Sequence, residues 1–149
     1  DSLRKNIIPI LVGVIVGSIV AMILAIFVSK GLGLDQDLVV SLVPQSITTA
    51  IAISLTAEYN GIVALTAIMV VLRGVIGAAI APLILKVFKI TDPIAQGVAI
   101  GTSAHAVGTS EARKMGQIQG AMSGLSIAIA GIVTVVLMPL AMLIVDSVF

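Results

Sequence analysis

Cysteine and tryptophan are absent from this chain of 149 residues, and charged and aromatic residues are scarce. Without cysteine, the chain can form no disulfide and no thiolate metal site. Charged residues make up 10% of the sequence and the formal net charge is +1, which gives no basic surface for a nucleic-acid partner. His105 is the only histidine, so we expect no metal site of any kind.

Catalytic patterns are also missing from the sequence. No serine stands beside a recognisable base, no carboxylate pair lies in an apolar stretch, and no phosphate-binding loop occurs. We therefore expect neither enzymatic activity nor a cofactor.

Hydrophobic residues, in contrast, make up 59% of the chain, and its mean hydropathy is +1.26. Soluble domains carry about 25% charged residues, far more than this chain. Three apolar stretches, residues 7–28, 62–87 and 118–145, reach the roughly 20 residues that cross a bilayer. The composition predicts an all-α integral membrane protein that lies in the lipid bilayer of the cell (cytoplasmic) membrane as a multi-pass protein.

The start of the chain carries its own expectation. The sequence opens at Asp1 rather than at a methionine, with Arg4 and Lys5 directly before the first span. We expect residues 1–149 to form a single transmembrane domain and to be a piece of a longer protein whose N-terminal spans are missing.

Residues 38–57 are apolar but interrupted, and Pro44 marks the interruption. Proline disfavours helix at the residue before it and suits the first position of a new helix. The segment therefore predicts two half-helices that meet at Pro44, Gln45 and Ser46.

A second interrupted segment begins after Asp92 with the apolar residues 94–100. Gly101, Thr102 and Ser103 follow and predict the second break, because glycine permits loosened backbone and close helix approach. A polar half-helix to Lys114 then leads into the last span.

The two interrupted segments have the same order of parts. Placing Asp35 on Asp92 also aligns further serine, glycine and proline residues, namely Ser46 with Ser103, Gly74 with Gly131 and Pro82 with Pro139. We therefore predict two repeats, residues 38–88 and 94–145, each a broken or re-entrant helix pair followed by a transmembrane helix.

The positions of lysine and arginine favour an inverted arrangement of these repeats. If both interrupted segments dip into the membrane and return, six of the seven counted cations lie inside and only Lys30 lies outside. If both segments cross, the division is four to three. The re-entrant case is the build of a secondary transporter, with broken helices that meet near the midplane. Crossing broken helices remain the alternative.

Polar residues gather at both breaks and form the candidate binding site. Half-helix N-termini present free N–H groups and a positive dipole end, which suit a carboxylate. Helix breaks or close backbone approach are expected at Pro44, Gly101 and Gly108. The candidate substrate-binding residues are Gln45, Ser46, Thr48, Thr49, Thr102, Ser103, His105, Thr109 and Ser110. The alternative is that these hydroxyls bond back to helix carbonyls or join neighbouring helices.

Two ionisable residues fall inside the apolar region. His105 offers one donor and one acceptor when neutral, and it is our candidate for proton coupling; its alternative is a bond to a backbone carbonyl inside the bundle. Arg73 lies near the middle of residues 62–87, where it can serve an anionic substrate, pair with Glu58 or Glu111, or lie between subunits. Glu111, together with Arg113 and Lys114, is expected to form a solvated helix end.

Three ordered motifs resemble the LrgB/CidB family: LVPQSITTAIA (residues 42–52), NGIVALTA (60–67) and GTSAHAVGTS (101–110). The resemblance implies one of two functions. Some members are described as antiholin-like or holin-like proteins that modulate murein hydrolase activity and autolysis, often with a small LrgA/CidA-type membrane partner. Related proteins include a plastid glycolate/glycerate carrier and bacterial pyruvate uptake systems.

The chain departs from the family pattern at two positions. Members often carry lysine where this chain has Gln45, and proline where it has Ala50. The first difference removes a candidate counter-ion for a carboxylate. The histidine of the second motif is retained as His105, and Ser46, Thr48 and Thr49 match the first motif.

Our reading of the sequence is a transporter of small monocarboxylates of the pyruvate, lactate and glycolate class, proton-coupled and working by alternating access. We expect a homodimer or higher homo-oligomer. The alternative is a holin-like or antiholin-like pore or regulator of murein hydrolase activity, for which a selective site is not needed. A purely structural membrane partner is the third hypothesis, and it predicts that His105 and Ser46 can be replaced without effect.

Overall fold

The protein is entirely helical over residues 2–149, which the computed structural model describes, with side chains described from Asn6 onward. The helices are α1 (Ser2–Gly31), α2 (Gln36–Leu42), α3 (Thr49–Glu58), α4 (Val63–Val87), α5 (Pro93–Met115) and α6 (Gln117–Val148). Three of them, α1, α4 and α6, are long and apolar enough to cross a membrane. This confirms three long apolar helices at the predicted stretches, which is compatible with a membrane protein.

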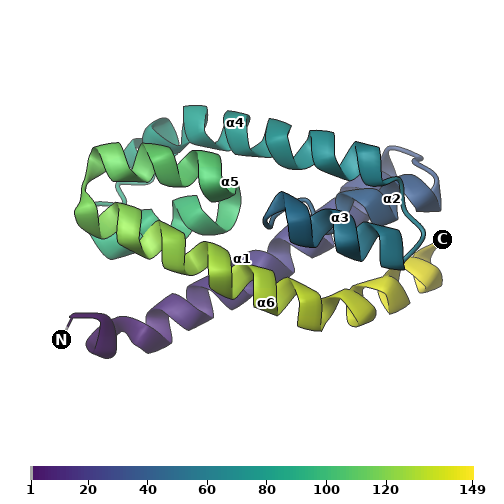
Figure 1. The fold of residues 1–149 in the computed structure, drawn as a ribbon, viewed down its shortest axis with the longest axis horizontal. Coiled ribbons are helices and arrows are strands. Elements are labelled where there is room, and N and C mark those ends of the chain that lie inside the picture. The colour runs from purple at the N-terminus through teal and green to yellow at the C-terminus, as the bar shows by residue number, and fades with distance from the viewer. Residues whose placement is uncertain (1) are drawn as a thin grey trace.

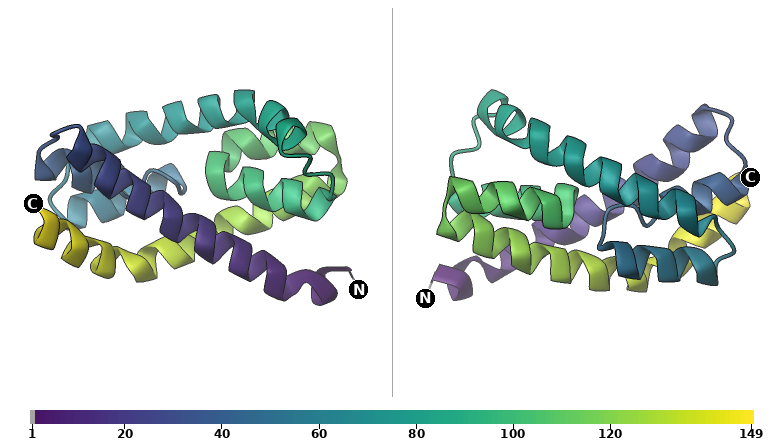
Figure 2. Two further views of the ribbon diagram at one scale, coloured as in Figure 1. Left: turned by 180° about the vertical axis from the view of Figure 1, so that it is seen from behind. Right: turned by 45° about the horizontal axis from the view of Figure 1, so that its top comes forward.

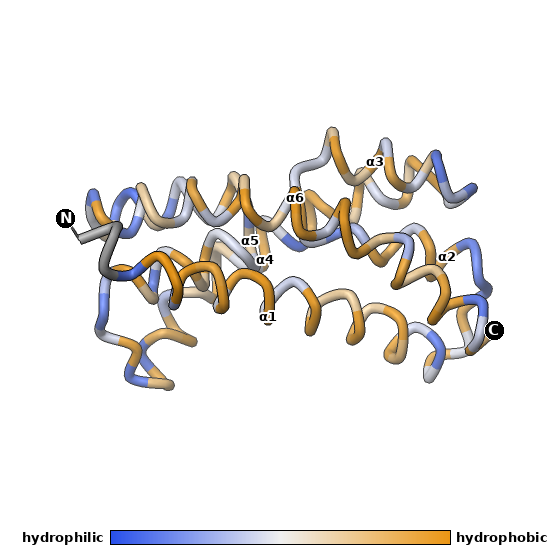
Figure 3. Tube along the Cα trace, turned by 90° about the horizontal axis from the view of Figure 1, so that it is seen from below, coloured by the Kyte–Doolittle hydropathy of each residue, from blue (hydrophilic) through white to orange (hydrophobic). Residues whose placement is uncertain are grey.

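The three long helices run the length of the molecule, and the short helices fill its two ends (Figure 1). The α2–α3 segment doubles back at one end, and α5 doubles back at the other, as the view from behind also shows (Figure 2). Each interrupted segment therefore reverses its direction at its break, as the re-entrant alternative requires. The apolar residues of α1 form a long band with hydrophilic residues near its ends (Figure 3).

Packing centres on α5 and α6, which share the largest interface, and α4 covers α5 from the other side. One apolar core joins α1, α2, α3 and α6 around Ile26, Val39 and Met138. A smaller core lies around Ile100 and Leu85. The outward faces of the long helices expose large apolar side chains, as expected for surfaces in contact with lipid.

A buried hydroxyl network fastens the first interrupted segment to α4. Thr66 of α4 donates to the backbone oxygen of Ser41 (2.8 Å) and shares a hydrogen bond with Thr56 of α3 (2.8 Å). The Ser41 hydroxyl accepts from the backbone N–H of Ile62 at 2.6 Å. The network holds α2, α3 and the start of α4 in one unit.

The boundaries of the two interrupted segments correspond when Asp35 is placed on Asp92. Both aspartates are N-cap residues, of α2 and of α5. The same shift places Thr48, the N-cap of α3, on His105, and the end of α3 at Glu58 on the end of α5 at Met115. Of the aligned residues that the sequence suggested, Asp35 and Asp92 fall on helix boundaries, whereas the paired glycines and prolines lie inside α4 and α6.

Candidate functional site: two helix breaks that face each other

The first break covers residues 43–48, between α2 and α3. Pro44 and Ser46 are buried there, while Gln45 is half-buried. Two predicted half-helices meeting at this proline are confirmed. The second half-helix starts at Thr49, however, rather than near Gln45, because the backbone stays in turns up to the extended ψ of 139° at Thr48.

The second break lies at His105, whose backbone is non-helical, with φ 44° and ψ −134°. The predicted break at Gly101, Thr102 and Ser103 is wrong, since these residues lie within the first half of α5. A positive φ in a residue other than glycine costs on the order of 1–3 kcal/mol and is held only by surrounding structure. Strain of this kind gathers at functional sites.

Close helix packing, and not a break, accounts for the glycine at position 101. A side chain at Gly101 would collide with the backbone of Ser123 on α6, so this glycine serves close helix packing. Gly108 has the same purpose, because its missing Cβ leaves room for Ala104 and Ile100 on the other half of α5. Gly77 of α4 lies against Ala104 as well, which lets α4 approach the turn of the hairpin.

The two breaks meet at His105. Its imidazole is buried (4% exposed) and faces the backbone of Gln45 and Ser46 in the first break. The tip of α5 and the start of α3 accordingly face each other near the middle of the molecule (Figure 1). The convergence of both polar patches follows from these contacts.

Three buried polar atoms near this meeting point have no hydrogen-bond partner among the described residues. They are Nε2 of His105, Oγ of Ser46 and Oγ of Ser126 on α6. Unsatisfied polar groups cost free energy unless water or a ligand supplies the missing bond. The Ser18 and Thr134 hydroxyls share this property on α1 and α6.

Helix register places Ser126 beside the break. In the first half of α5, Gly101 packs on Ser123 of α6. In the returning half, Thr109 shares a hydrogen bond with the same Ser123 at 2.7 Å. Both halves of the hairpin therefore converge on α6 at Ser123, and from helix geometry we infer that Ser126, almost one turn further along α6, lies near the connection at His105.

Arg73 of α4 completes the polar group at the breaks. Its Nε donates to the backbone oxygen of Ser103 at 3.1 Å, and its charge acts on His105. It forms no ion pair with Glu58 or Glu111 among the described residues, so those two alternatives fail.

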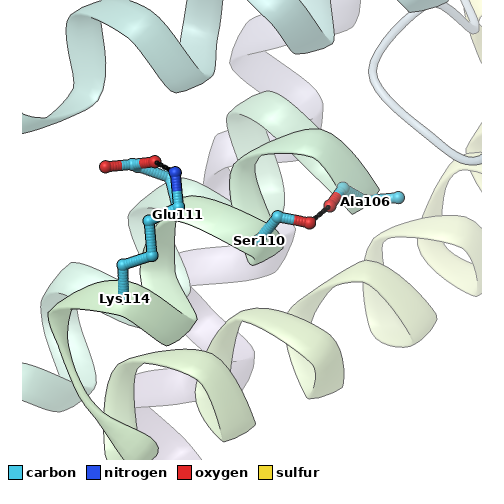
Figure 4. Close-up of polar contacts among 4 residues, drawn as sticks. All are labelled: Ala106, Ser110, Glu111 and Lys114. Atoms are coloured by element: carbon cyan, nitrogen blue, oxygen red, sulfur yellow. Dashed lines mark hydrogen bonds and ion pairs between the residues drawn. The ribbon is translucent and has the colours of Figure 1, made fainter.

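The remaining candidate residues are divided between the interior and the surface. Thr102 and Ser103 donate to carbonyls one turn earlier in α5, at 2.8 and 2.7 Å. Thr109 is buried, and its hydroxyl bonds to the backbone oxygen of His105 and to the Ser123 hydroxyl. Thr49 and Ser110 are exposed. Ser110 lies one turn after Ala106, with a hydroxyl-to-oxygen distance of 3.4 Å (Figure 4).

The end of α5 is the solvated helix end that the sequence predicted. Lys114 and Glu111 form an ion pair at 2.9 Å, and the Lys114 side chain is 72% exposed (Figure 4). Arg113 is exposed next to them. These charges do not reach the breaks.

The sequence analysis did not single out Ser126, and it left the role of Arg73 open among three alternatives. Ser126 lies in a largely apolar span, and only the i, i+3 spacing from Ser123 indicates that the two serines share one face of α6. Arg73 was visible as a charge in a span, but its partner is a backbone oxygen, which no sequence pattern reveals.

Comparison with known proteins gives one family. The model of the LrgB-like family matches residues 1–144. Antiholin-like protein LrgB from Bacillus cereus strain B4264 and from strain AH187 is 39% identical over 142 residues, as is the protein of that name from Bacillus anthracis strain CDC 684 / NRRL 3495. Each alignment covers 95% of this chain, and the chain spans 62% of the length of these relatives. No solved structure matches the chain.

Proposed function

We propose, from the premise that this chain belongs to the LrgB-like family, that it has the antiholin-like function for which its relatives are named. In this function a membrane protein restrains a lesion and so regulates the access of murein hydrolases to the cell wall. This is the alternative of the sequence analysis, and the name of the relatives favours it over transport. The protein would lie as a multi-pass protein in the cytoplasmic membrane and act with a small LrgA/CidA-type partner.

One structural observation supports restraint rather than lesion formation. A wide aqueous lesion must be lined by polar side chains that its subunits expose. Between their ends, α1, α4 and α6 expose apolar side chains, such as Val20, Val71 and Val136, while Ser46 and His105 of the breaks are buried. Surfaces of this composition pack against lipid or another apolar helix.

Dye-loaded liposomes test this proposal. The protein alone should leave the dye trapped, and it should reduce the dye release caused by a co-reconstituted LrgA/CidA-type partner. Dye release by the protein alone would contradict the proposal. Liposomes that contain an unrelated helical membrane protein at the same density provide the control for crowding.

A carrier of small monocarboxylates is the second candidate function, and the meeting of the two breaks favours it. Broken helices that converge on buried, unpartnered polar atoms at His105, Ser46 and Ser126 resemble the sites of secondary transporters. The corresponding boundaries of the interrupted segments, which enter from opposite ends, support an inverted repeat. Alternating access would be a movement of these repeats against a homodimeric or larger assembly, with His105 as the proton-coupling residue.

Uptake measurements separate this candidate from the first. Saturable entry of radiolabelled pyruvate under a pH gradient, without loss of trapped dye, would establish a carrier. Absence of uptake together with restraint of the partner's lesion would leave the antiholin-like function alone.

A further inference from the structure

Arg73 is the one charged residue in the described part of the chain that lies near the middle of a predicted membrane span. It stands about 15 Å from the start of α4 and about 21 Å from its end, at 1.5 Å per residue. A guanidinium at this depth is costly unless it faces a cavity or an opposite charge. Among the described residues it has no acidic partner.

The guanidinium still has free donors. Only Nε is engaged, by the backbone oxygen of Ser103, while the two terminal amino groups carry four N–H donors and bond to no described residue. The terminal edge of a guanidinium matches the two oxygens of a carboxylate. The bond to Ser103 fixes the side chain without neutralising it.

Two cavities adjoin Arg73 on opposite sides. One, of about 370 Å³, runs between α4 and the first half of α5, from Arg73 past Ile80 to Leu85. The other, of about 300 Å³, lies between α1, the first break and Met69 of α4, and Gln45 is among its lining residues. Arg73 is the one residue that lines both, so the cavities approach it from the two ends of α4.

We propose that Arg73 is the anion-selecting residue of a site between these two cavities, and that its terminal amino groups bind the carboxylate of a small organic acid. Gln45 adds a neutral donor from one side, and the apolar walls of both cavities accept a short hydrocarbon group. Because Arg73 lies far from both ends of α4, the anion that it binds is a solute that enters by a cavity and not the phosphate of a lipid headgroup.

This inference deepens the carrier candidate and rests on it, so its test measures binding and not transport. The purified protein, in detergent without phospholipid, is mixed with radiolabelled pyruvate, and propionate or propionamide competes. Propionate should displace pyruvate, whereas propionamide, its uncharged counterpart, should not. Equal competition by the amide would overturn the role of charge.

Substitutions test whether the positive charge that binds pyruvate is that of Arg73. Arg73→Gln should weaken pyruvate binding by about tenfold or more, because a charge-assisted pair is lost, and Arg73→Lys should recover part of it. Lys86→Gln removes the same charge from the exposed end of the same helix and should bind as the parent does. Unchanged binding by folded Arg73→Gln would overturn the proposal.

A measurement on the unaltered protein guards against variants that do not fold. Phenylglyoxal modifies arginine, and peptide mass spectrometry distinguishes Arg73 from Arg4 and Arg113. Pyruvate should protect Arg73 and leave the modification of Arg113 unchanged; no protection would contradict the proposal.

Binding without uptake would reject the carrier and retain the site, whereas uptake by Arg73→Gln at the parent rate and affinity would reject the site and retain the carrier. Dissociation of an oligomer by Arg73→Gln, without pyruvate binding in the parent, would assign Arg73 to a subunit contact instead.

Discussion

Arg73 on α4 donates a hydrogen bond from Nε to the backbone oxygen of Ser103 on α5, at 3.1 Å. The usual helical donor for that oxygen, the N–H of Val107, lies beyond the break at His105. The break at His105 therefore leaves the backbone oxygen of Ser103 without its usual helical donor, and the Arg73 side chain supplies a donor in its place. This link joins the costly arginine to the strained histidine in one polar group.

Close packing at Gly101 should make this position intolerant of any side chain. Gly101→Ala places a Cβ against the backbone of Ser123, which cannot move as a flexible side chain can, and should destabilise the protein by about 1–3 kcal/mol. Gly124→Ala, on the same interface helix but with open space around it, is the matched control and should be neutral or slightly stabilising. Thermal unfolding in detergent compares the two. Equal melting temperatures would contradict the packing role of Gly101.

Replacing Ser126 with alanine should lower pyruvate uptake without lowering the stability of the protein. Its hydroxyl is buried and unpartnered, so Ser126→Ala removes an unsatisfied group and should leave the melting temperature unchanged or raise it. If the hydroxyl serves the site, pyruvate uptake should fall in the same variant. Ser123→Ala is the control, because it breaks the hydrogen bond to Thr109 and should lower the melting temperature. Full uptake by Ser126→Ala would make this hydroxyl a packing residue only.

Two substitutions at His105 should separate the effect of backbone strain on stability from the effect of the imidazole on transport. His105→Gly removes the imidazole but suits the positive φ, and His105→Ala removes the imidazole while keeping the strain. The glycine variant should therefore be more stable than the alanine variant, by roughly 1 kcal/mol. In a proton-coupled carrier, both variants should lose the pH dependence of uptake that the parent shows. A pH profile that is the same in all three proteins would remove His105 from proton coupling.

The sequence was most informative where proline, glycine and aspartate punctuate apolar runs. Hydropathy located the three long helices, because a bilayer demands about 20 apolar residues in a row. Pro44 located the first break, since proline restricts its own backbone and that of the preceding residue. Asp92, after which the sequence placed the second interrupted segment, is the N-cap of α5 and accepts a hydrogen bond from the backbone N–H of Ala95.

Tertiary packing decided the features that the sequence misplaced. Gly101 suggested a break, yet it lies in helix because α6 comes too close for a side chain. The break moved to His105, where local propensity gives no reason for a positive φ. Contacts between distant helices hold that conformation, and a single sequence does not contain them in readable form. For the same reason, the cavities beside Arg73 had no local signal.

The measurement that tests the central claim most directly is dye release from liposomes that contain the protein alone, the LrgA/CidA-type partner alone, or both. Apolar outer faces and buried polar breaks predict that the protein by itself keeps the dye trapped and that it lowers the release caused by the partner in proportion to its amount. Dye release by the protein alone, or unaltered release in the mixture, would contradict the antiholin-like account.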